Sequence, residues 1–163
     1  MANDYIFDVD VHGALHITND FINRIKNFRQ IRSNDKESGG VILGSHLALD
    51  GWLSIVDFTQ PQPADKCSRY HFHRSSMHNE LVNKIWHASN KTITYLGLWH
   101  THPEPNPIPS KQDHSDWEDA VRNSKFDGNA LLFMIIGTSH IGIWLGVKNK
   151  SQFIKIGTIN LGE

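Results

Sequence analysis

Two histidines and one aspartate in the segment WHTHPEPNPIPSKQD, residues 99–113, have the spacing of metal ligands. His100 and His102 flank one residue at the end of an apolar run that predicts a β-strand. Because side chains alternate along a strand, both imidazoles point to the same side and can share one ion. Asp113 follows in the first turn of a predicted helix. Two imidazoles, one carboxylate and a fourth position left for water are the ligand set of a catalytic zinc site.

The same aspartate belongs to a second pattern, whose meaning is structural. Ser110-x-x-Asp113 is a capping box, which begins many helices that carry no functional site. Four prolines between residues 103 and 109 favour the metal site, because they fix φ and make this segment a stiff connector. Such a connector can hold Asp113 against the histidine pair.

Hydrolysis at a metal also requires a group that takes a proton from water and passes it to the leaving amine. Glu37, in DKESGGVILG, is the candidate because it stands just before the pair Gly39-Gly40 and a predicted strand. Glycines allow backbones to approach closely there. A solvated loop glutamate gives the same pattern, so this assignment depends on the other residues.

Composition indicates an ordinary globular protein. The 163 residues are 39% hydrophobic and 20% charged, which predicts a single domain over residues 1–163. A net charge of −1 argues against nucleic acid as a partner, and no apolar run approaches the roughly 20 residues that cross a membrane. The one cysteine, Cys67, excludes an internal disulfide and a cysteine-rich zinc site, so a reducing cytoplasm is expected.

The periodicity predicts an α/β (α+β) fold, with strands in a sheet and about three helices. Helices are expected over residues 17–32, 76–88 and 110–124. Strands are expected over residues 39–49, 51–60, 92–99, 130–137, 140–147 and 151–159. Asp50-Gly51 is a hairpin signal between the first two strands, and such antiparallel pairs exclude a purely parallel doubly wound sheet.

Together these residues resemble the JAMM (JAB/MPN) metalloprotease family. Its signature is a glutamate ahead of a glycine-containing strand, then His-x-His, seven residues, Ser, two residues and Asp. The matching positions are Glu37, His100, His102, Ser110 and Asp113. The resemblance implies that the two histidines and the aspartate bind one Zn²⁺ per chain. It also implies that Glu37 is the general base and then the general acid, and that Ser110 donates a hydrogen bond to the developing oxyanion.

The resemblance covers roughly residues 22–147 and implies a cytidine-deaminase-like JAB/MPN sandwich with a central mixed β-sheet and about three helices. Residues 64–74 and 95–117, and the absence of the insertions of eukaryotic deubiquitinases, look like one bacterial subgroup. That subgroup is encoded in CBASS anti-phage operons beside a cGAS/DncV-like nucleotidyltransferase (CD-NTase) and an E1–E2 fusion protein. The likeness implies a cytoplasmic peptidase or isopeptidase that removes or trims the conjugated CD-NTase C-terminus. Leu98 is a departure, because the subgroup often has an acid there.

Other interpretations stay open. A non-catalytic MPN scaffold that binds a protein partner and a deconjugase for another ubiquitin-like protein fit the same fold. The ligand set also occurs in non-haem Fe(II) oxygenases, although their usual order, His-x-Asp/Glu and then a distant His, is not found here. A nucleoside deaminase is disfavoured because its Pro-Cys-x-x-Cys ligands are missing.

Substrate contacts are expected from residues around the motif. Arg69 and Arg74 are candidates for binding the C-terminal tail, and Trp99 is a candidate for a wall of the cleft. His71 and His73 form a second His-x-His, but no acid follows at a fitting distance and arginines flank the pair. Structural or substrate-contact roles are therefore expected for these two histidines, rather than metal binding.

Overall fold

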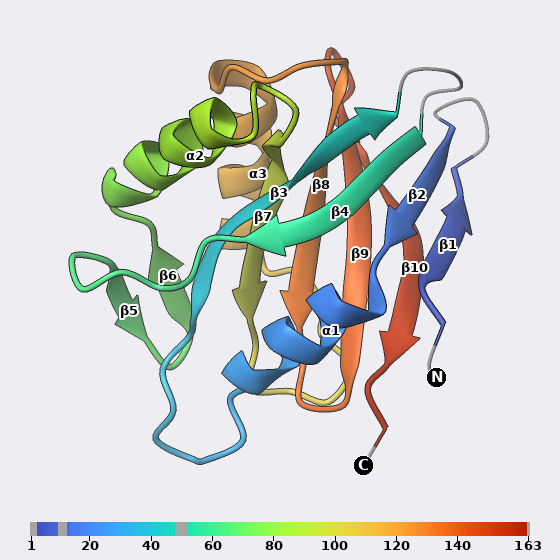
Figure 1. Ribbon diagram of the computed structural model, residues 1–163. Coiled ribbons are helices and arrows are strands. Elements are labelled where there is room, and N and C mark those ends of the chain that lie inside the picture. The colour runs from blue at the N-terminus through green and yellow to red at the C-terminus, as the bar shows by residue number, and fades with distance from the viewer. Residues whose placement is uncertain (1–2, 10–12, 48–51, 163) are drawn as a thin grey trace.

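The computed structural model describes residues 3–9, 13–47 and 52–162, whose strands form one large sheet and one small hairpin (Figure 1). The large sheet has the order β1-β2-β4-β3-β7-β8-β9-β10. Its strands are β1 (Tyr5–Asp8), β2 (Ala14–Ile17), β3 (Gly39–Leu47), β4 (Trp52–Phe58), β7 (Thr94–Thr101), β8 (Ala130–Ile136), β9 (His140–Val147) and β10 (Phe153–Asn160). The hairpin consists of β5 (Lys66–Ser68) and β6 (His71–His73). The helices are α1 (Asn19–Ile25), continued by the 3₁₀ turn η2 (Lys26–Phe28), α2 (Met77–Ala88) and α3 (Lys111–Asn123).

The sheet is mixed, as the family resemblance implies. The pairs β2–β4 and β7–β8 are parallel, and the other neighbours are antiparallel. A parallel pair needs a crossover, and α3 lies in the crossover from β7 to β8. The predicted turn at Asp50-Gly51 lies outside the described residues. None of the described helices has the length and apolar character to cross a membrane.

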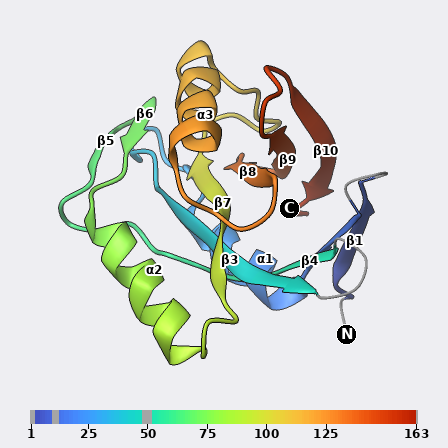
Figure 2. The ribbon, with the colours of Figure 1, turned by 90° about the horizontal axis from the view of Figure 1, so that it is seen from above.

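Apolar side chains cover both faces of the sheet. Along β8, Leu132, Met134 and Ile136 join the core beneath α1, whereas Leu131, Phe133 and Ile135 join the core beneath α2 and α3. Figure 2 shows these two helices on the side of β7 that is away from α1. A strand that is buried on both faces reads as a continuous apolar run, and this explains why the strand was predictable. The two cores hold the C-terminal end of β7, and with it the histidine motif, in a fixed place.

The first predicted helix is shorter than expected. It was predicted over residues 17–32, but α1 ends at Ile25 and only η2 continues it. Gln30 is the reason, because its buried amide donates to the carbonyls of Asp35 and Arg69 and its oxygen accepts from Thr101. These bonds hold the segment after η2 in a loop, and Ile31 is 63% exposed instead of lying on a helix face.

A buried hydrogen-bond chain fixes the connection from β4 to α2. Thr59 Oγ1 accepts from the Val41 N–H at 2.8 Å and lies 2.7 Å from His78 Nδ1. Because an ionised Asp65 only accepts hydrogen bonds, His78 Nε2–H donates to it at 2.9 Å, and Nδ1 of the neutral ring then accepts from the Thr59 hydroxyl. The side chains of His78 and Asp65 are 1% and 2% exposed. The chain therefore anchors the segment that carries the β5–β6 hairpin.

Asp65 makes this anchor dependent on pH. Burial raises the pKa of the Asp65 carboxyl, but hydrogen bonds from the N–H groups of Gln62 and Ser75 and from His78 outweigh burial and leave the pKa below its usual value. A carboxyl with a lowered folded pKa contributes stability that is complete above its unfolded pKa, about 3.9. This contribution is lost as the pH falls through the folded value.

We expect Asp65→Asn to lower the free energy of unfolding by about 1–3 kcal/mol at neutral pH, because buried donors lose a charged acceptor. The difference from the wild type should shrink as the pH falls from about 4 through the lowered folded pKa, because the wild-type carboxyl is then protonated as well. Urea unfolding between neutral and acidic pH measures both effects. Asp127→Asn, at an exposed position, is the control. Equal stability losses in the two variants would contradict the role of the Asp65 chain.

Candidate metal centre

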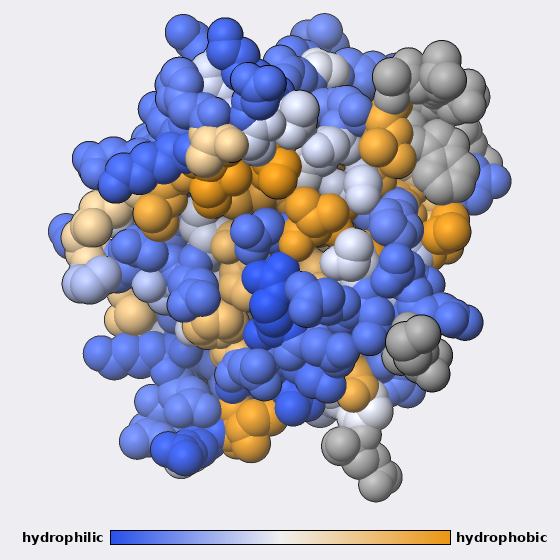
Figure 3. All heavy atoms as spheres, in the orientation of Figure 1, coloured by the Kyte–Doolittle hydropathy of each residue, from blue (hydrophilic) through white to orange (hydrophobic). Residues whose placement is uncertain are grey.

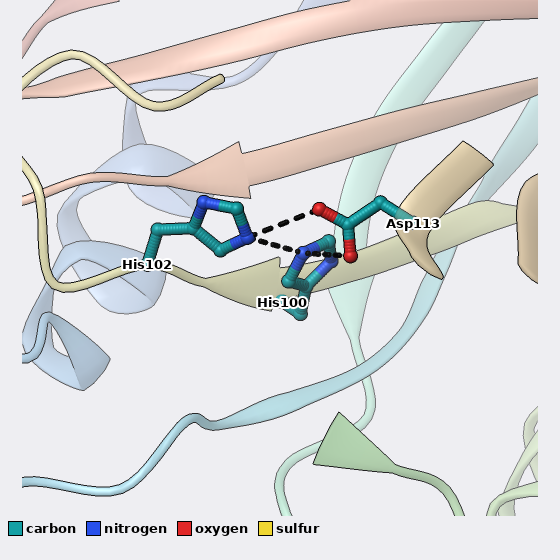
Figure 4. Close-up of side chains that lie close together, drawn as sticks. All are labelled: His100, His102 and Asp113. Atoms are coloured by element: carbon teal, nitrogen blue, oxygen red, sulfur yellow. Dashed lines mark hydrogen bonds and ion pairs between the residues drawn. The ribbon is translucent and has the colours of Figure 1, made fainter. Parts of the chain in front are cut away.

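His100, His102 and Asp113 meet where β7 ends and α3 begins (Figure 4). The Nε2 atoms of His100 and His102 are 3.1 Å apart. Asp113 Oδ1 lies 3.1 Å from His100 Nε2, and Asp113 Oδ2 lies 3.1 Å from His102 Nε2. The three side chains are only 9–13% exposed. The structure therefore brings the three predicted ligands together in a buried cluster.

Strand alternation aims the two imidazoles at the same point. The intervening Thr101 has no exposed surface and points the other way, where its Oγ1 donates to Gln30 and accepts from the Ser38 N–H. Backbone hydrogen bonds then attach the connector to the sheet, from His102 N to Ile136 O and from His140 N to Pro105 O. The bend after β7 is therefore held along its length, as the prolines suggested.

Ser110 and Asp113 form the predicted capping box at the start of α3. Ser110 Oγ accepts from the Asp113 N–H at 3.0 Å, and Asp113 Oδ2 accepts from the Ser110 N–H at 2.8 Å. The same carboxylate reaches both histidines. Asp113 can therefore cap the helix and present an oxygen to a metal ion at the same time, because a carboxylate has four lone-pair positions.

The electrostatics of the cluster favour a cation between the three groups. Burial raises the pKa of Asp113, but hydrogen bonding to His100 and His102 prevails and holds its pKa well below the usual range. Burial lowers the pKa of His102, but its bonds to Asp113 and Glu104 outweigh burial and raise the pKa to about 9. Burial dominates at His100 and lowers its pKa. A proton on His102 thus compensates the Asp113 charge, and a metal ion can replace that proton.

The donor set fits a zinc ion. One ligand atom from each of His100, His102 and Asp113 can be chosen so that all three lie within 4.8 Å of one another, and no other such group occurs among the described residues. Two ligands of a tetrahedral ion at about 2.0–2.1 Å lie roughly 3.4 Å apart, close to the spacing found here. Three protein ligands leave a fourth position open, as in catalytic sites.

Glu37 lies beside this cluster. Its Oε1 is 4.0 Å from His102 Nε2, and its side chain is 4% exposed. Burial is the main cause that raises the pKa of Glu37 to about 8, with His102 lowering it and Asp113 raising it. Gly39 makes room nearby, because a Cβ there would lie 2.5 Å from the Phe72 ring. The glycine pair therefore permits the close approach that the sequence suggested.

Glu37 and Ser110 line one pocket together with His100 and Asp113. The Ser110 hydroxyl accepts from the Asp113 N–H and donates to none of the described residues. Its proton is therefore free for an acceptor in the pocket. The structure thus places four of the five signature residues at one pocket, and the fifth, His102, contacts Asp113 and lies beside Glu37.

The expectation that Trp99 forms a wall of the cleft is wrong. It has no exposed surface and packs with Phe28 and Phe58, and its Nε1 donates to Thr59 O at 3.1 Å. The cause is the same alternation that positions His100, because the preceding residue must point to the opposite face. Trp99 therefore supports the core beneath α1 and does not wall the cleft.

The other predicted contact residues divide into two groups. Arg69 donates to the carbonyl of Arg32 at 3.0 Å and lies over the Tyr70 ring, so its guanidinium supports the loop before β3. Arg74 lines the pocket and makes no hydrogen bond or ion pair with the described residues. His71 and His73 are exposed and belong to no group of three metal donors in the described chain.

One polar contact of the cluster, made by Glu104, was not predicted from the sequence. Its Oε1 lies 3.0 Å from Nδ1 of His102, the ring nitrogen that does not face Asp113. Histidines that bind metals usually donate this second nitrogen to a carboxylate or carbonyl. An acid two residues after a candidate ligand was therefore an available signal.

The chain belongs to the JAB-domain family of prokaryotes. A family model described as prokaryotic homologs of the JAB domain matches residues 29–152. This confirms the family resemblance that the motif carries. A likeness in fold agrees, because the solution structure of protein DSY2949 from Desulfitobacterium hafniense has a TM-score of 0.60 at 18% identity. The match covers 85% of this chain and 87% of that chain.

Curated relatives with one shared name are similar over most of this chain. A protein of Escherichia coli named CD-NTase/cGAS isopeptidase is 30% identical over 155 residues, 94% of each chain. A protein of the same name from Pseudomonas aeruginosa is 35% identical over 138 residues, 83% of this chain and 85% of that protein. One from Vibrio cholerae serotype O1 is 32% identical over 130 residues, with coverages of 79% and 78%.

We expect His100→Ala to weaken Zn²⁺ binding by more than the roughly 10- to 100-fold that is lost when only a supporting residue of a ligand is removed. The wild type should gain thermal stability on addition of Zn²⁺, because the folded state binds the ion. Competition with a chromogenic chelator measures the affinity. His71→Ala is the matched control, because His71 lines the same pocket. If His71→Ala lost zinc and His100→Ala retained it, the assignment would be reversed.

Proposed function

We propose that the protein is a JAMM-type zinc isopeptidase that hydrolyses the amide bond at the conjugated C-terminus of a CD-NTase. The observation that carries the proposal is the buried His100, His102 and Asp113 cluster with the carboxyl of Glu37 beside it. The relatives named CD-NTase/cGAS isopeptidase support the choice of substrate. Conjugation by an E1–E2 fusion protein and a place in anti-phage defence in the bacterial cytoplasm belong to the same proposal.

The roles of the residues follow from their positions. His100, His102 and Asp113 would hold the zinc ion, which when bound acidifies water and polarises the scissile carbonyl. Glu37 takes the proton of the attacking water and delivers it to the leaving amine. Burial suits it to this task, because it accepts no hydrogen bond from the described residues and its pKa is raised to about 8. The Ser110 hydroxyl donates a hydrogen bond to the developing oxyanion and keeps its proton.

The alternatives have less support. A non-catalytic scaffold needs neither a ligand set nor a buried base, yet the chain keeps both at one pocket. An iron oxygenase needs the ligands in another sequence order. A deconjugase for another ubiquitin-like protein uses the same machinery, and only the names of the relatives favour a CD-NTase.

We expect Glu37→Gln to keep zinc affinity and to lose at least about 100-fold in cleavage rate, because proton transfer contributes 10²–10⁴-fold in enzymes. The substrate is a CD-NTase C-terminus fused through an amide bond to a reporter protein. Glu80→Gln, an exposed charge on α2, is the control. An unchanged rate in Glu37→Gln with zinc bound contradicts the assigned role.

A groove leads from the pocket along α2 and α3. It has a volume of about 1060 Å³ and shares Phe72, Arg74 and Asp116 with the catalytic pocket. The groove is lined by residues of β3, α2, β7 and α3. On the face drawn in Figure 3, apolar side chains also gather beside α2, where it meets β3 and β4. Arg69 is engaged with backbone carbonyls, so we assign the contact with the substrate tail to Arg74, at the junction of the two spaces. Its N–H groups, which bond to none of the described residues, are available to acceptors on an extended peptide.

We expect Arg74→Ala to raise KM for the tail substrate about tenfold with a smaller change in kcat, because a hydrogen bond to a charged group contributes about 1.5–3 kcal/mol. Steady-state kinetics on the same fusion substrate measure the split. Arg122→Ala, an exposed arginine on α3, controls for the loss of charge. A KM that stays at the wild-type value in Arg74→Ala would contradict the assignment of Arg74 to the substrate contact.

A further inference from the structure

The carboxylate of Glu104 contacts the side of His102 that faces away from the metal cluster. Figure 4 shows one ring nitrogen of His102 directed at Asp113 and the other turned away from it. Glu104 Oε1 lies 3.0 Å from that second nitrogen, Nδ1. The same oxygen accepts from the Ile108 N–H at 2.8 Å. One carboxylate oxygen therefore joins a candidate ligand to the far end of the connector.

This contact decides which nitrogen of His102 carries the proton. An ionised carboxylate only accepts hydrogen bonds, and an ordinary glutamate, with a pKa of about 4.3, is ionised at neutral pH. Nδ1 must therefore be the donor to Glu104, and the lone pair of the neutral ring is then on Nε2. Nε2 is the atom that faces Asp113. Without the carboxylate, the neutral ring divides between two tautomers, of which only one presents its lone pair to an ion.

The hydrogen bond from the Ile108 N–H connects Glu104 to the part of the connector that leads to Asp113. Four prolines leave residues 103–109 with only three backbone N–H donors, those of Glu104, Asn106 and Ile108. Glu104 O also accepts from the Thr138 N–H at 2.9 Å, which ties this residue to the β8–β9 turn. Glu104 thus braces both ends of the connector, just before Ser110 begins the helix that carries Asp113.

We propose that Glu104 is a positioning residue of the metal centre, which fixes His102 as a Nδ1–H tautomer and braces the connector that presents Asp113. The inference rests on the metal site of the proposed function. The positioning role applies to His102 alone, because among the described residues no carboxylate bonds to Nδ1 of His100. The His100 ring instead lies beside the Trp117 ring, with 6.5 Å between the two centroids. Glu104 bonds to the nitrogen of His102 that faces away from the predicted metal position and does not line the pocket, so it acts through His102.

The test is zinc affinity of Glu104→Gln, measured without substrate by competition with a chelator. Glutamine keeps the size of the side chain and removes its charge, so we expect zinc binding about 10- to 100-fold weaker than in the wild type. Glu118→Gln, an exposed glutamate on α3, should bind zinc as the wild type does. Glu104→Asp is the second variant and keeps the charge with a shorter reach. It should fall between the wild type and Glu104→Gln.

A spectroscopic signature separates positioning from a general loss of stability. Long-range ¹H–¹⁵N NMR of the zinc-loaded wild type should show a downfield, slowly exchanging proton on His102 Nδ1, and Glu104→Gln should shift it upfield. The imidazole signals of His100 should stay in place. Unchanged zinc affinity and an unchanged His102 signal in Glu104→Gln overturn the inference alone. A wild type that binds no zinc would overturn the proposed function as well.

Discussion

The carboxylate of Asp113 is the interaction on which the site depends. One oxygen faces His100, and the other faces His102 and accepts the backbone N–H that begins α3. A strand end and a helix start are thereby joined through one side chain. The negative charge of this carboxylate is buried between two imidazoles, so it is stable only with a positive charge beside it. Either a proton on an imidazole or a metal ion can supply that charge.

The fold supplies the rigidity that this arrangement needs. β7 lies between β3 and β8 in the middle of the sheet, and cores cover both of its faces. α3 is the crossover from β7 to β8, so its N-terminus returns to the edge where β7 ends (Figure 1). Trp117, one turn after Asp113, is buried against Phe133 and fixes the rotation of the helix. The ligands therefore come from two elements whose relative placement is set by packing.

The strand carrying His100 and the helix start at Ser110 were predictable, because periodicity and capping are local properties of the chain, whereas the mixed sheet followed from the family resemblance. β1, β2, β5 and β6 were missed because each has only three or four residues, too few for a clear alternation. Ile31 was misassigned because the bonds of Gln30 to distant residues override local helical spacing. Trp99 was misassigned although alternation alone placed it opposite His100. Glu104 was missed because proximity to a ligand's second nitrogen depends on the turn of the connector.

The most direct test of the central claim is a crystal structure of the zinc-soaked protein with anomalous diffraction at the zinc edge. The account predicts one strong peak within about 2.0–2.2 Å of Nε2 of His100, Nε2 of His102 and a carboxylate oxygen of Asp113. The coordination position of the zinc ion that faces Glu37 should hold water or substrate. No peak between these three side chains, or a peak on His71 and His73 instead, would contradict the account.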